Sequence, residues 1–294
     1  MPELARPALL GPTDIRELAA RISLRPSRQL GQNFVIDAGT VTKIATMAGL
    51  SLRDIVIEVG PGFGSLTLPL LARAGRVVAV ELDPALAAQL PVTVAARAAD
   101  LAGRLEVVTG DAARLTELPG QPPDVLVANL PYNAAVPVVL HLLAEFPSIR
   151  RCLVMVQAEV ADRMAAAPAS RTYGIPSVKL AWYGHARTAG SVPRSVFWPV
   201  PRVDSGLVAL TRQDRPDAAD VRREDVFAIV DAAFAQRRKM LRTALAAWAG
   251  SVAQAERLLR SAGVDPALRG EALGIADYIQ IARAAASART IIES

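Results

Sequence analysis

The sequence predicts an α/β fold, a Rossmann-like sheet followed by a small all-α C-terminal domain. Between residues 55 and 167, short apolar runs rich in valine and isoleucine alternate with helical patterns, which is typical of parallel strands covered by helices on both faces. A glycine-rich turn, Gly60–Gly64, follows the first of these runs. Beyond residue 213 the apolar residues recur at helical spacing, which predicts a separate helical domain.

The elements of the α/β part are predicted in order from these patterns. The apolar runs predict strands at Ile55–Val59, Arg76–Glu81, Leu105–Thr109, Asp124–Ala128 and Cys152–Gln157. The segments that follow them predict helices at Gly64–Ala74, Pro84–Leu90, Ala135–Glu145 and Glu159–Ala167. Upstream we expect a short helix near Asp14–Ile22, and Asp37 is placed to cap a helix over Thr40–Ala48.

The second half of the chain changes character. Ser177–Tyr183 and Ser205–Leu210 are predicted to be longer strands that form an antiparallel pair, and the polar stretch Arg212–Asp220 is predicted to be a linker. Helices are then expected at Glu224–Ala235, Arg238–Trp248, Val252–Ser261 and Ile275–Ser287. The chain is therefore divided into a basic N-terminal arm (1–28), a main α/β domain (29–212) and a helical C-terminal domain (213–294).

Composition excludes several classes of protein. With 294 residues, 52% of them hydrophobic, the chain can bury a large core, yet no apolar run approaches the length of a membrane span. The N-terminus lacks the basic start and apolar middle of a signal peptide. One cysteine, Cys152, and two histidines make a zinc site unexpected. We expect a cytoplasmic protein without a structural metal or a membrane partner.

The charge distribution indicates a polyanionic partner. The formal net charge is +5 and the sequence pI is about 9.9. The cationic side chains gather in three places, namely Arg16, Arg21, Arg25 and Arg28, then Arg150-Arg151, then Arg237-Arg238-Lys239 with Arg242. Each cluster alone also fits a solvated surface, but together they favour an RNA or DNA surface.

Acidic residues follow the first three predicted strands and indicate the kind of ligand at the glycine turn. Glu58 precedes the turn, Glu81 ends the second strand and Asp111 follows the third. A carboxylate at the first position opposes a pyrophosphate and favours a cation, while Glu81 is placed to accept ribose hydroxyls. This arrangement fits S-adenosylmethionine, which carries a sulfonium and an ammonium but no phosphate, better than NAD. The alternative is that these acids only cap helices and hold turns.

The tetrapeptide Asn129-Leu130-Pro131-Tyr132 directly follows the predicted strand Asp124–Ala128. Such a loop suits alkylation of the exocyclic amine of a base, which is a poor nucleophile because its lone pair is delocalised into the ring. The Asn129 side-chain oxygen and the Leu130 carbonyl can accept the two N–H bonds, Pro131 fixes the backbone, and Tyr132 offers a stacking face. An ordinary strand-ending turn is the competing interpretation.

The chain resembles the ribosomal RNA adenine N6,N6-dimethyltransferases, and within them the bacterial small-subunit (16S) branch linked to kasugamycin sensitivity. The motifs that carry the resemblance are Leu30-Gly31-Gln32-Asn33-Phe34, Glu58–Thr67, Asn129-Leu130-Pro131-Tyr132-Asn133, Gln157–Arg163 and Phe234-Ala235-Gln236-Arg237-Arg238-Lys239. They cover about residues 28–245 in order. The last two motifs are the specific ones, because many methyltransferases share the glycine turn.

The resemblance implies roles for individual residues. The S-adenosylmethionine site would be lined by Asn33, Val35, Gly60, Glu81, Asp111 and Asn129. The target adenine would be held by Asn129, Leu130, Pro131 and Tyr132, with Phe197 as a second stacking aromatic. RNA would be contacted by Arg237, Arg238 and Lys239 of the helical domain. Asn33 and Val35 stand where many relatives have histidine and leucine, and Ala169-Ser170 replaces a more usual Gly-Ser.

The function that the resemblance implies is S-adenosylmethionine-dependent N6,N6-dimethylation of two adjacent adenosines. These would lie in a loop near the 3′ end of small-subunit (16S) rRNA, within a pre-30S particle during ribosome biogenesis, and the enzyme would act as a monomer. A large-subunit rRNA methylase of the macrolide-resistance type is the nearest alternative. A DNA adenine methyltransferase and an RNA-binding assembly factor without essential methylation are further ones.

Overall fold

The computed structural model describes residues 7–27, 31–131, 134–214 and 218–293, and the chain forms two compact units. The first comprises Met1–Ala161 and Arg187–Arg212, and the second comprises Asp162–Ala186 and Gln213–Ser294. Residues 162–186, which the sequence analysis assigned to the α/β domain, thus belong to the second unit. Within the described ranges, no helix has the length and apolar content needed to span a lipid bilayer.

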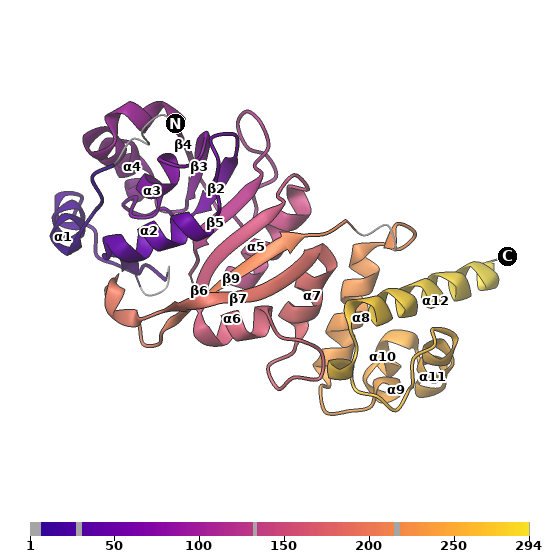
Figure 1. Cartoon of the computed structure of the whole chain (residues 1–294). Helices are drawn as coiled ribbons and strands as arrows, with labels where there is room; N and C mark the ends of the chain where they lie inside the picture. The colour runs from indigo at the N-terminus through magenta and orange to yellow at the C-terminus, as the bar shows by residue number, and fades with distance from the viewer. Residues whose placement is uncertain (1–6, 28–30, 132–133, 215–217, 294) are drawn as a thin grey trace. The chain divides into compact units, whose positions relative to one another are not determined.

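A seven-stranded sheet in the order β4-β3-β2-β5-β6-β9-β7 organises the first unit (Figure 1). Its strands are β2 (Ile55–Val59), β3 (Arg76–Glu81), β4 (Leu105–Thr109), β5 (Val125–Asn129), β6 (Arg151–Gln157), β7 (Gly184–Val192) and β9 (Ser205–Arg212). The strands from β4 to β6 are parallel and β9 is antiparallel to β6. This confirms the predicted Rossmann-like sheet. The chain order reverses at β2, which lies between β3 and β5, and open α/β sheets form their binding crevice at such a point.

Helices cover the sheet and supply its core. In the first unit they are α1 (Pro12–Arg21), α2 (Ala38–Met47), α3 (Thr67–Leu71), α4 (Pro84–Arg97), α5 (Ala135–Glu145), the start of α6 (Ala158–Met164), and the short 3-10 turns Ala99–Arg104 and Arg194–Val196. The predicted cap of α2 is confirmed, because the Asp37 carboxylate accepts the Thr40 N–H at 2.6 Å. Side chains such as Val56, Val77 and Leu70 are fully buried between the layers.

The segment predicted as a basic arm is folded into the first unit as far as it is described. Leu10, Ile15 and Leu18 are buried in the same core as the sheet. The Asp14 carboxylate accepts the Gly11 N–H at 2.8 Å and pairs with Arg97 of α4 at 2.5 Å. The Gly11 hydrogen bond and Arg97 lower the pKa of Asp14 although partial burial opposes them.

The predicted strand Ser177–Tyr183 is wrong, because this segment is the helix α7 (Ile175–Tyr183). Its alternating apolar residues suggested a strand, but Pro176 lies in the first turn and the Ser177 hydroxyl accepts the Gly174 N–H at 3.1 Å, which starts a helix. The strand in this region is β7, whose mixed composition gave no apolar run. Accordingly β9 pairs with β6, in the register Arg151↔Thr211, and not with residues 177–183.

The second unit is helical, with α7, α8 (Arg223–Ala235), α9 (Leu241–Ala244), α10 (Ala246–Ala249), α11 (Val252–Ser261), α12 (Ile275–Glu293) and the 3-10 turn Gly270–Ala272. The single helix predicted over Arg238–Trp248 is two short ones. Tyr173 and Tyr278 are buried in the core, and their hydroxyls donate to the carbonyls of Leu273 at 2.8 Å and Gly270 at 2.9 Å. These bonds satisfy polar groups that would otherwise be buried without partners.

Candidate active site

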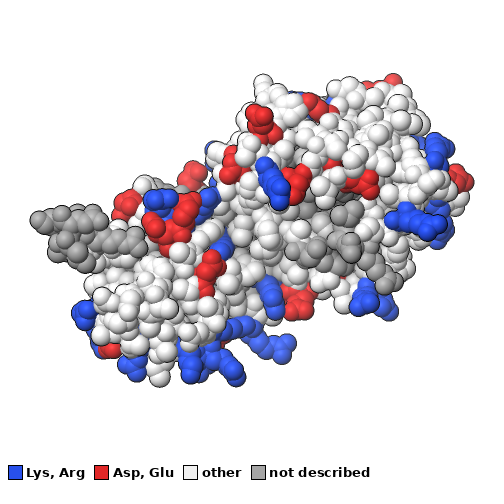
Figure 2. All heavy atoms as spheres, turned by 180° about the vertical axis from the view of Figure 1, so that it is seen from behind, with Lys and Arg blue, Asp and Glu red and all other residues white. Residues whose placement is uncertain are grey.

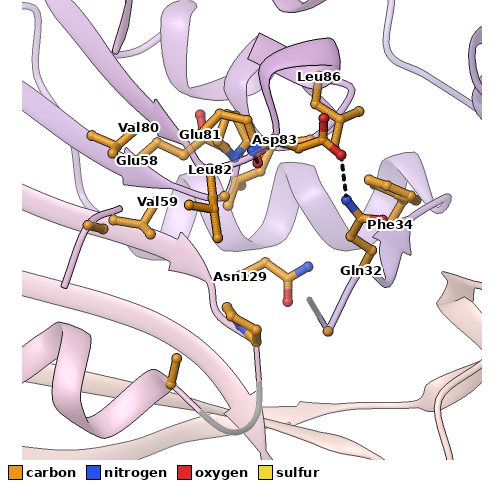
Figure 3. A pocket seen from close by; sticks show the side chains of 18 of the residues that line it. Gln32, Phe34, Glu58, Val59, Val80, Glu81, Leu82, Asp83, Leu86 and Asn129 are labelled. Atoms are coloured by element: carbon orange, nitrogen blue, oxygen red, sulfur yellow. Dashed lines mark hydrogen bonds between the residues drawn. The ribbon is translucent and has the colours of Figure 1, made fainter. Parts of the chain in front are cut away.

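A cavity opens at the carboxyl ends of β2, β3 and β5, where the strand order reverses (Figure 3). All six residues predicted to bind the cofactor line it, namely Asn33, Val35, Gly60, Glu81, Asp111 and Asn129. They come from segments far apart in the sequence, and the parallel sheet brings them together because its strands end at one edge.

The glycine turn shapes the floor of this cavity. Gly60 and Gly62 adopt positive φ angles of 68° and 56°, which glycine tolerates at little cost. A Cβ atom at Gly62 would lie 2.8 Å from the Phe34 ring. The turn is therefore closed against β1 (Phe34–Val35), and only glycine fits this contact.

Glu81 is fixed by the main chain around it. One carboxylate oxygen accepts the Gly62 N–H at 3.0 Å, and the other accepts the Asp83 N–H at 3.0 Å. Burial raises the pKa of Glu81 in spite of these hydrogen bonds. The carboxylate is thus held rigidly at the rim of the cavity, and each oxygen keeps a lone pair for a further donor.

Glu58 is the most unusual acid in the cavity. Its side chain is 1% exposed, and within the described part of the chain one of its oxygens has no hydrogen-bond partner. Burial raises the pKa of Glu58 to about 8, and the nearby charge of Glu81 acts in the same direction. A buried acid with an unsatisfied oxygen ionises more readily when a cation binds beside it, so this cavity favours a cationic ligand over a phosphate.

The predicted catalytic loop begins at the end of β5. The Asn129 side-chain nitrogen donates to the Asn33 carbonyl at 3.1 Å, which leaves its oxygen as an acceptor at the cavity. The Leu130 side chain is buried and its N–H donates to the Met155 carbonyl at 3.0 Å, while Pro131 lines the cavity. Tyr132 lies outside the described residues.

Phe197 does not lie where the sequence analysis expected. It belongs to β8 (Phe197–Trp198), which pairs with β1 so that Val35 faces Phe197. Its ring is 1% exposed and packs in the core, and it does not line the cavity. A buried ring has no free face for a base, so Phe197 supports the cavity wall through Val35 in this conformation.

Other cavity residues were missed, although they flank predicted ones. Phe34 closes on the glycine turn, Leu82 is 53% exposed beside Glu81, and Gln32 donates to Asp83 at 3.1 Å. The sequence contained one indication of their role, because Gln32 and Phe34 flank Asn33 and Leu82 follows Glu81. Within the described ranges, no group of His, Cys, Asp and Glu side chains is arranged to hold a metal ion.

The predicted RNA-binding residues lie in the second unit and differ in their surroundings. Arg237 pairs with Glu271 at 2.8 Å and donates to the Arg171 carbonyl at 2.9 Å. Arg238 and Lys239 are exposed, and the described residues give neither a carboxylate partner. Figure 2 shows Lys and Arg side chains protruding from several places on the surface. Two of the three predicted cations are thus available to a polyanion.

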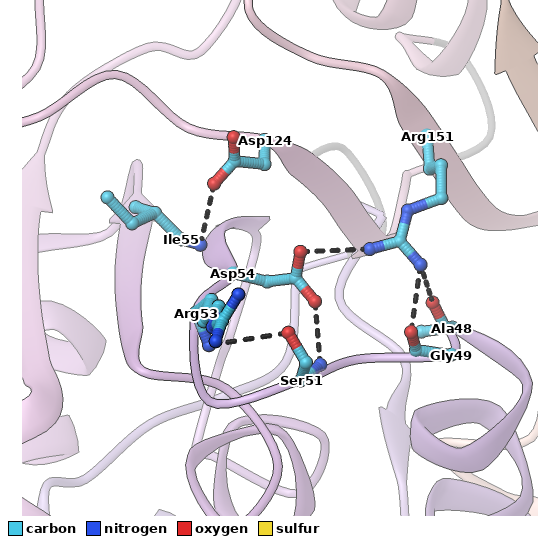
Figure 4. A network of polar contacts seen from close by, with 8 residues as sticks. All are labelled: Ala48, Gly49, Ser51, Arg53, Asp54, Ile55, Asp124 and Arg151. Carbon is cyan, nitrogen blue, oxygen red and sulfur yellow. Dashed lines mark hydrogen bonds and ion pairs between the residues drawn. The ribbon is translucent and has the colours of Figure 1, made fainter.

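The Arg150-Arg151 pair, by contrast, includes a structural residue (Figure 4). Arg151 pairs with Asp54 at 3.0 Å and donates to the carbonyls of Ala48 and Gly49, which end α2. A guanidinium at a helix C-terminus satisfies carbonyls that have no partner within the helix. Arg151 therefore joins the start of β6 to the end of α2, at the edge of the sheet opposite to the cavity.

Comparison with known proteins identifies the family. Residues 24–287 match the family model described as ribosomal RNA adenine dimethylase. The chain belongs to this family. Two curated relatives named ribosomal RNA small subunit methyltransferase A are each 63% identical to it. That of Kineococcus radiotolerans aligns over 94% of this chain and 91% of the relative, and that of Thermobifida fusca over 93% and 95%.

Solved structures share the fold of this rRNA adenine dimethylase family member. A dimethyladenosine transferase from Plasmodium falciparum superposes with a TM-score of 0.71 at 23% identity, over 84% of this chain and 95% of that chain. The 23S rRNA methyltransferase ErmE superposes with a TM-score of 0.63 at 26% identity, over 85% and 98%. Family membership confirms the resemblance found in the sequence and, with it, S-adenosylmethionine as the expected methyl donor.

Proposed function

We propose that this protein dimethylates N6 of two adjacent adenosines near the 3′ end of small-subunit rRNA, with S-adenosylmethionine as the methyl donor. The observation that carries the proposal is the Asn129 side-chain oxygen at the cavity, beside two buried acids that suit a cationic donor. The 63% identity to small-subunit methyltransferases supports the choice of rRNA.

The residues that would hold the cofactor divide by chemistry. Glu81, with its two fixed oxygens, is placed to accept the ribose hydroxyls. Asp111 is placed to accept from the adenine amino group. Glu58 would offset the positive charge of the methionine part by releasing its proton when that cation binds beside it. When bound, S-adenosylmethionine would supply a methyl group that is activated by the positively charged sulfur. The sulfur would keep the bonding electron pair and become a neutral thioether.

The Asn129 loop would orient the target adenine. The adenine N6 would accept the methyl group as the carbon–sulfur bond breaks and the new nitrogen–carbon bond forms, and the nitrogen would then lose a proton to water. The Asn129 oxygen and the Leu130 carbonyl would accept the N6 hydrogens. These acceptors stabilise the positive charge that develops on nitrogen, and orientation supplies most of the remaining acceleration.

A second methyl group must then fit at the same nitrogen. Ala134 lines the cavity and Ala135 follows it at the start of α5. Their small side chains leave room for N6-monomethyladenine to bind again. The second transfer would use only one of the two acceptors, because a single N–H remains on the nitrogen after the first transfer.

The RNA partner would be held in part by the helical unit. Arg238 and Lys239 are exposed cations without a carboxylate partner among the described residues, and such groups bind phosphates with a strong dependence on salt. The substrate would be the rRNA within a pre-30S particle in the cytoplasm, and the protein would act as a monomer.

Tritiated methyl transfer tests the proposal. Small and large subunits from cells that lack this methylation are incubated with the protein and labelled cofactor, and the rRNA is then digested to nucleosides. The proposal expects labelled N6,N6-dimethyladenosine from the small subunit alone. Label in the large subunit instead would support the large-subunit activity that ErmE has, and no label in either would overturn the proposal.

A further inference from the structure

The segment that leads into β1 forms one wall of the cavity and contacts the catalytic loop at two points. The Asn33 carbonyl accepts the Asn129 side-chain nitrogen at 3.1 Å. Gly31, with a φ angle of 64°, approaches Pro131 so closely that a Cβ atom would lie 2.6 Å from the proline Cβ. The orientation of the Asn129 carboxamide therefore depends on where residues 31–33 lie.

Gln32 fixes this segment from both sides. Its side-chain oxygen accepts the Ser27 N–H at 2.8 Å, and its own N–H donates to the Ser27 carbonyl at 3.1 Å. Its side-chain nitrogen donates to Asp83 at 3.1 Å (Figure 3). The segment is thus tied to the rim of the cavity by a side chain that is not among the predicted ligands.

Asp83 is a rigid anchor for this bond. Its other carboxylate oxygen accepts the Ala85 N–H at 2.9 Å and so caps α4. Its main-chain N–H donates to Glu81 at 3.0 Å. Because Asp83 is held by a helix end and by a buried acid, Gln32 has little freedom while its bond to Asp83 persists.

We propose that Gln32 is a positioning residue for methyl transfer, because it holds the Asn33 carbonyl against the Asn129 amide nitrogen. A carboxamide can present either its oxygen or its nitrogen to a ligand, and only the oxygen accepts the adenine N–H. With the nitrogen bound to Asn33, the oxygen faces the substrate. This inference rests on the proposed function and adds a residue that does not touch the reacting atoms.

Exchanging the donor and the acceptor of the hydrogen bond between Gln32 and Asp83 tests the proposal. In Gln32→Glu, the new carboxylate repels Asp83 and the segment is released. In the double variant Gln32→Glu/Asp83→Asn, the new asparagine nitrogen donates to the carboxylate introduced at position 32 while its oxygen still caps α4, and the net charge equals that of the wild type. The readout is the single-turnover rate of methyl transfer at saturating cofactor and saturating small subunits, with the melting temperature measured in parallel.

The expected result is a rate about tenfold lower for Gln32→Glu, which is a smaller effect than removing an oriented acceptor altogether. The double variant is expected to return to within about threefold of the wild type. A Gln32→Glu rate within about twofold of the wild type at saturating cofactor would overturn the proposal, since Gln32 would then only close the cavity on its ligand. A double variant no faster than the single one would overturn it as well.

A glycine pair supplies a second test that does not depend on charge. Gly31→Ala must push residues 31–33 away from Pro131 and is expected to lower the same rate at saturating cofactor. Gly263→Ala is the matched control, because Gly263 has a similar φ angle of 72° with no atom within 4 Å of the added Cβ. Equal rates for the two alanine variants would contradict the proposal. Absence of activity in wild type and variants alike would instead contradict the proposed function.

Discussion

The side-chain nitrogen of Asn129 lies 3.1 Å from the main-chain oxygen of Asn33, 96 residues earlier in the chain. This bond joins the end of β5 to the segment before β1, and it fixes which end of the carboxamide faces the cavity. The predicted catalytic loop is therefore oriented by a second segment that also lines the cavity. One hydrogen bond thus joins a wall of the cavity to the side chain proposed to accept the adenine amine.

Glu58 predicts a dependence of stability on pH. Its pKa is raised from the ordinary 4.5 to about 8, so between these values the folded protein holds a proton that the unfolded chain has released. The free energy of unfolding therefore falls as the pH rises through this window, by up to about 1.4 kcal/mol per pH unit. Thermal unfolding of the ligand-free protein at pH 5.5 and pH 8 measures it.

Glu58→Gln is the matched variant, because the amide cannot ionise. We expect it to gain stability over the wild type as the pH rises toward 8, because the substitution removes the titration of Glu58 and retains that of Glu81, whose pKa is also raised. Parallel pH profiles for the two proteins would show that Glu58 stays ionised in the folded state.

Because Arg238 and Lys239 are exposed cations, we expect them to contribute to the salt dependence of RNA binding. Replacing both with glutamine should weaken binding to small-subunit rRNA and lower the slope of log K against log salt by about 0.7–0.9 for each phosphate that is no longer neutralised. Filter binding at several salt concentrations measures the slope. The control pair Arg53→Gln/Arg257→Gln removes two other exposed cations, and an equal change in both pairs would mean that only net charge matters.

Arg237 is expected to behave differently from its two neighbours. Its guanidinium pairs with Glu271, and both side chains are partly exposed. Arg237→Gln should therefore cost the helical unit no more than about 1 kcal/mol of stability and change the salt slope less than Arg238→Gln does. A larger change in slope for Arg237→Gln would show that RNA displaces the ion pair.

A substitution at Phe197 distinguishes a ring that supports the cavity wall from a ring that stacks on the base. Because the ring is buried and its strand pairs with β1, Phe197→Leu should cost less stability than the roughly 3–5 kcal/mol of a Phe→Ala change and keep a wild-type rate of methyl transfer. If the ring stacked on the base, this change would instead weaken base binding by about 1–3 kcal/mol. Comparing the melting temperature with the KM for small subunits distinguishes the two.

Much of the sheet was predictable because its strands are buried on both faces. Runs such as Ile55–Val59 contain almost only apolar residues, so their positions follow from composition. The edge strand β7 is mostly exposed and has no such run, and α7 was mistaken for a strand. The alternation of apolar and polar residues in this segment suggested a strand, but Pro176 and Ser177 are a stronger signal for the start of a helix.

The candidate site was predictable where residues lie at strand ends, since parallel strands bring their carboxyl ends together. Glu58, Glu81, Asp111 and Asn129 follow this rule. The bridge from Gln32 to Asp83 joins residues 51 positions apart, and neither residue carries a signal for it. The burial of Phe197 was equally hidden, because it depends on the pairing of two short strands, β1 and β8.

Asn129→Ala tests the central claim most directly. Single-turnover methyl transfer to under-methylated small subunits is measured at saturating cofactor, alongside binding of the variant to the same particles. We expect the rate to fall by about 10²–10³-fold, as for removal of a preorganised partner of the developing charge, with particle binding unchanged. A variant that methylates at the wild-type rate would contradict the assignment of the Asn129 oxygen as the acceptor of the adenine amine.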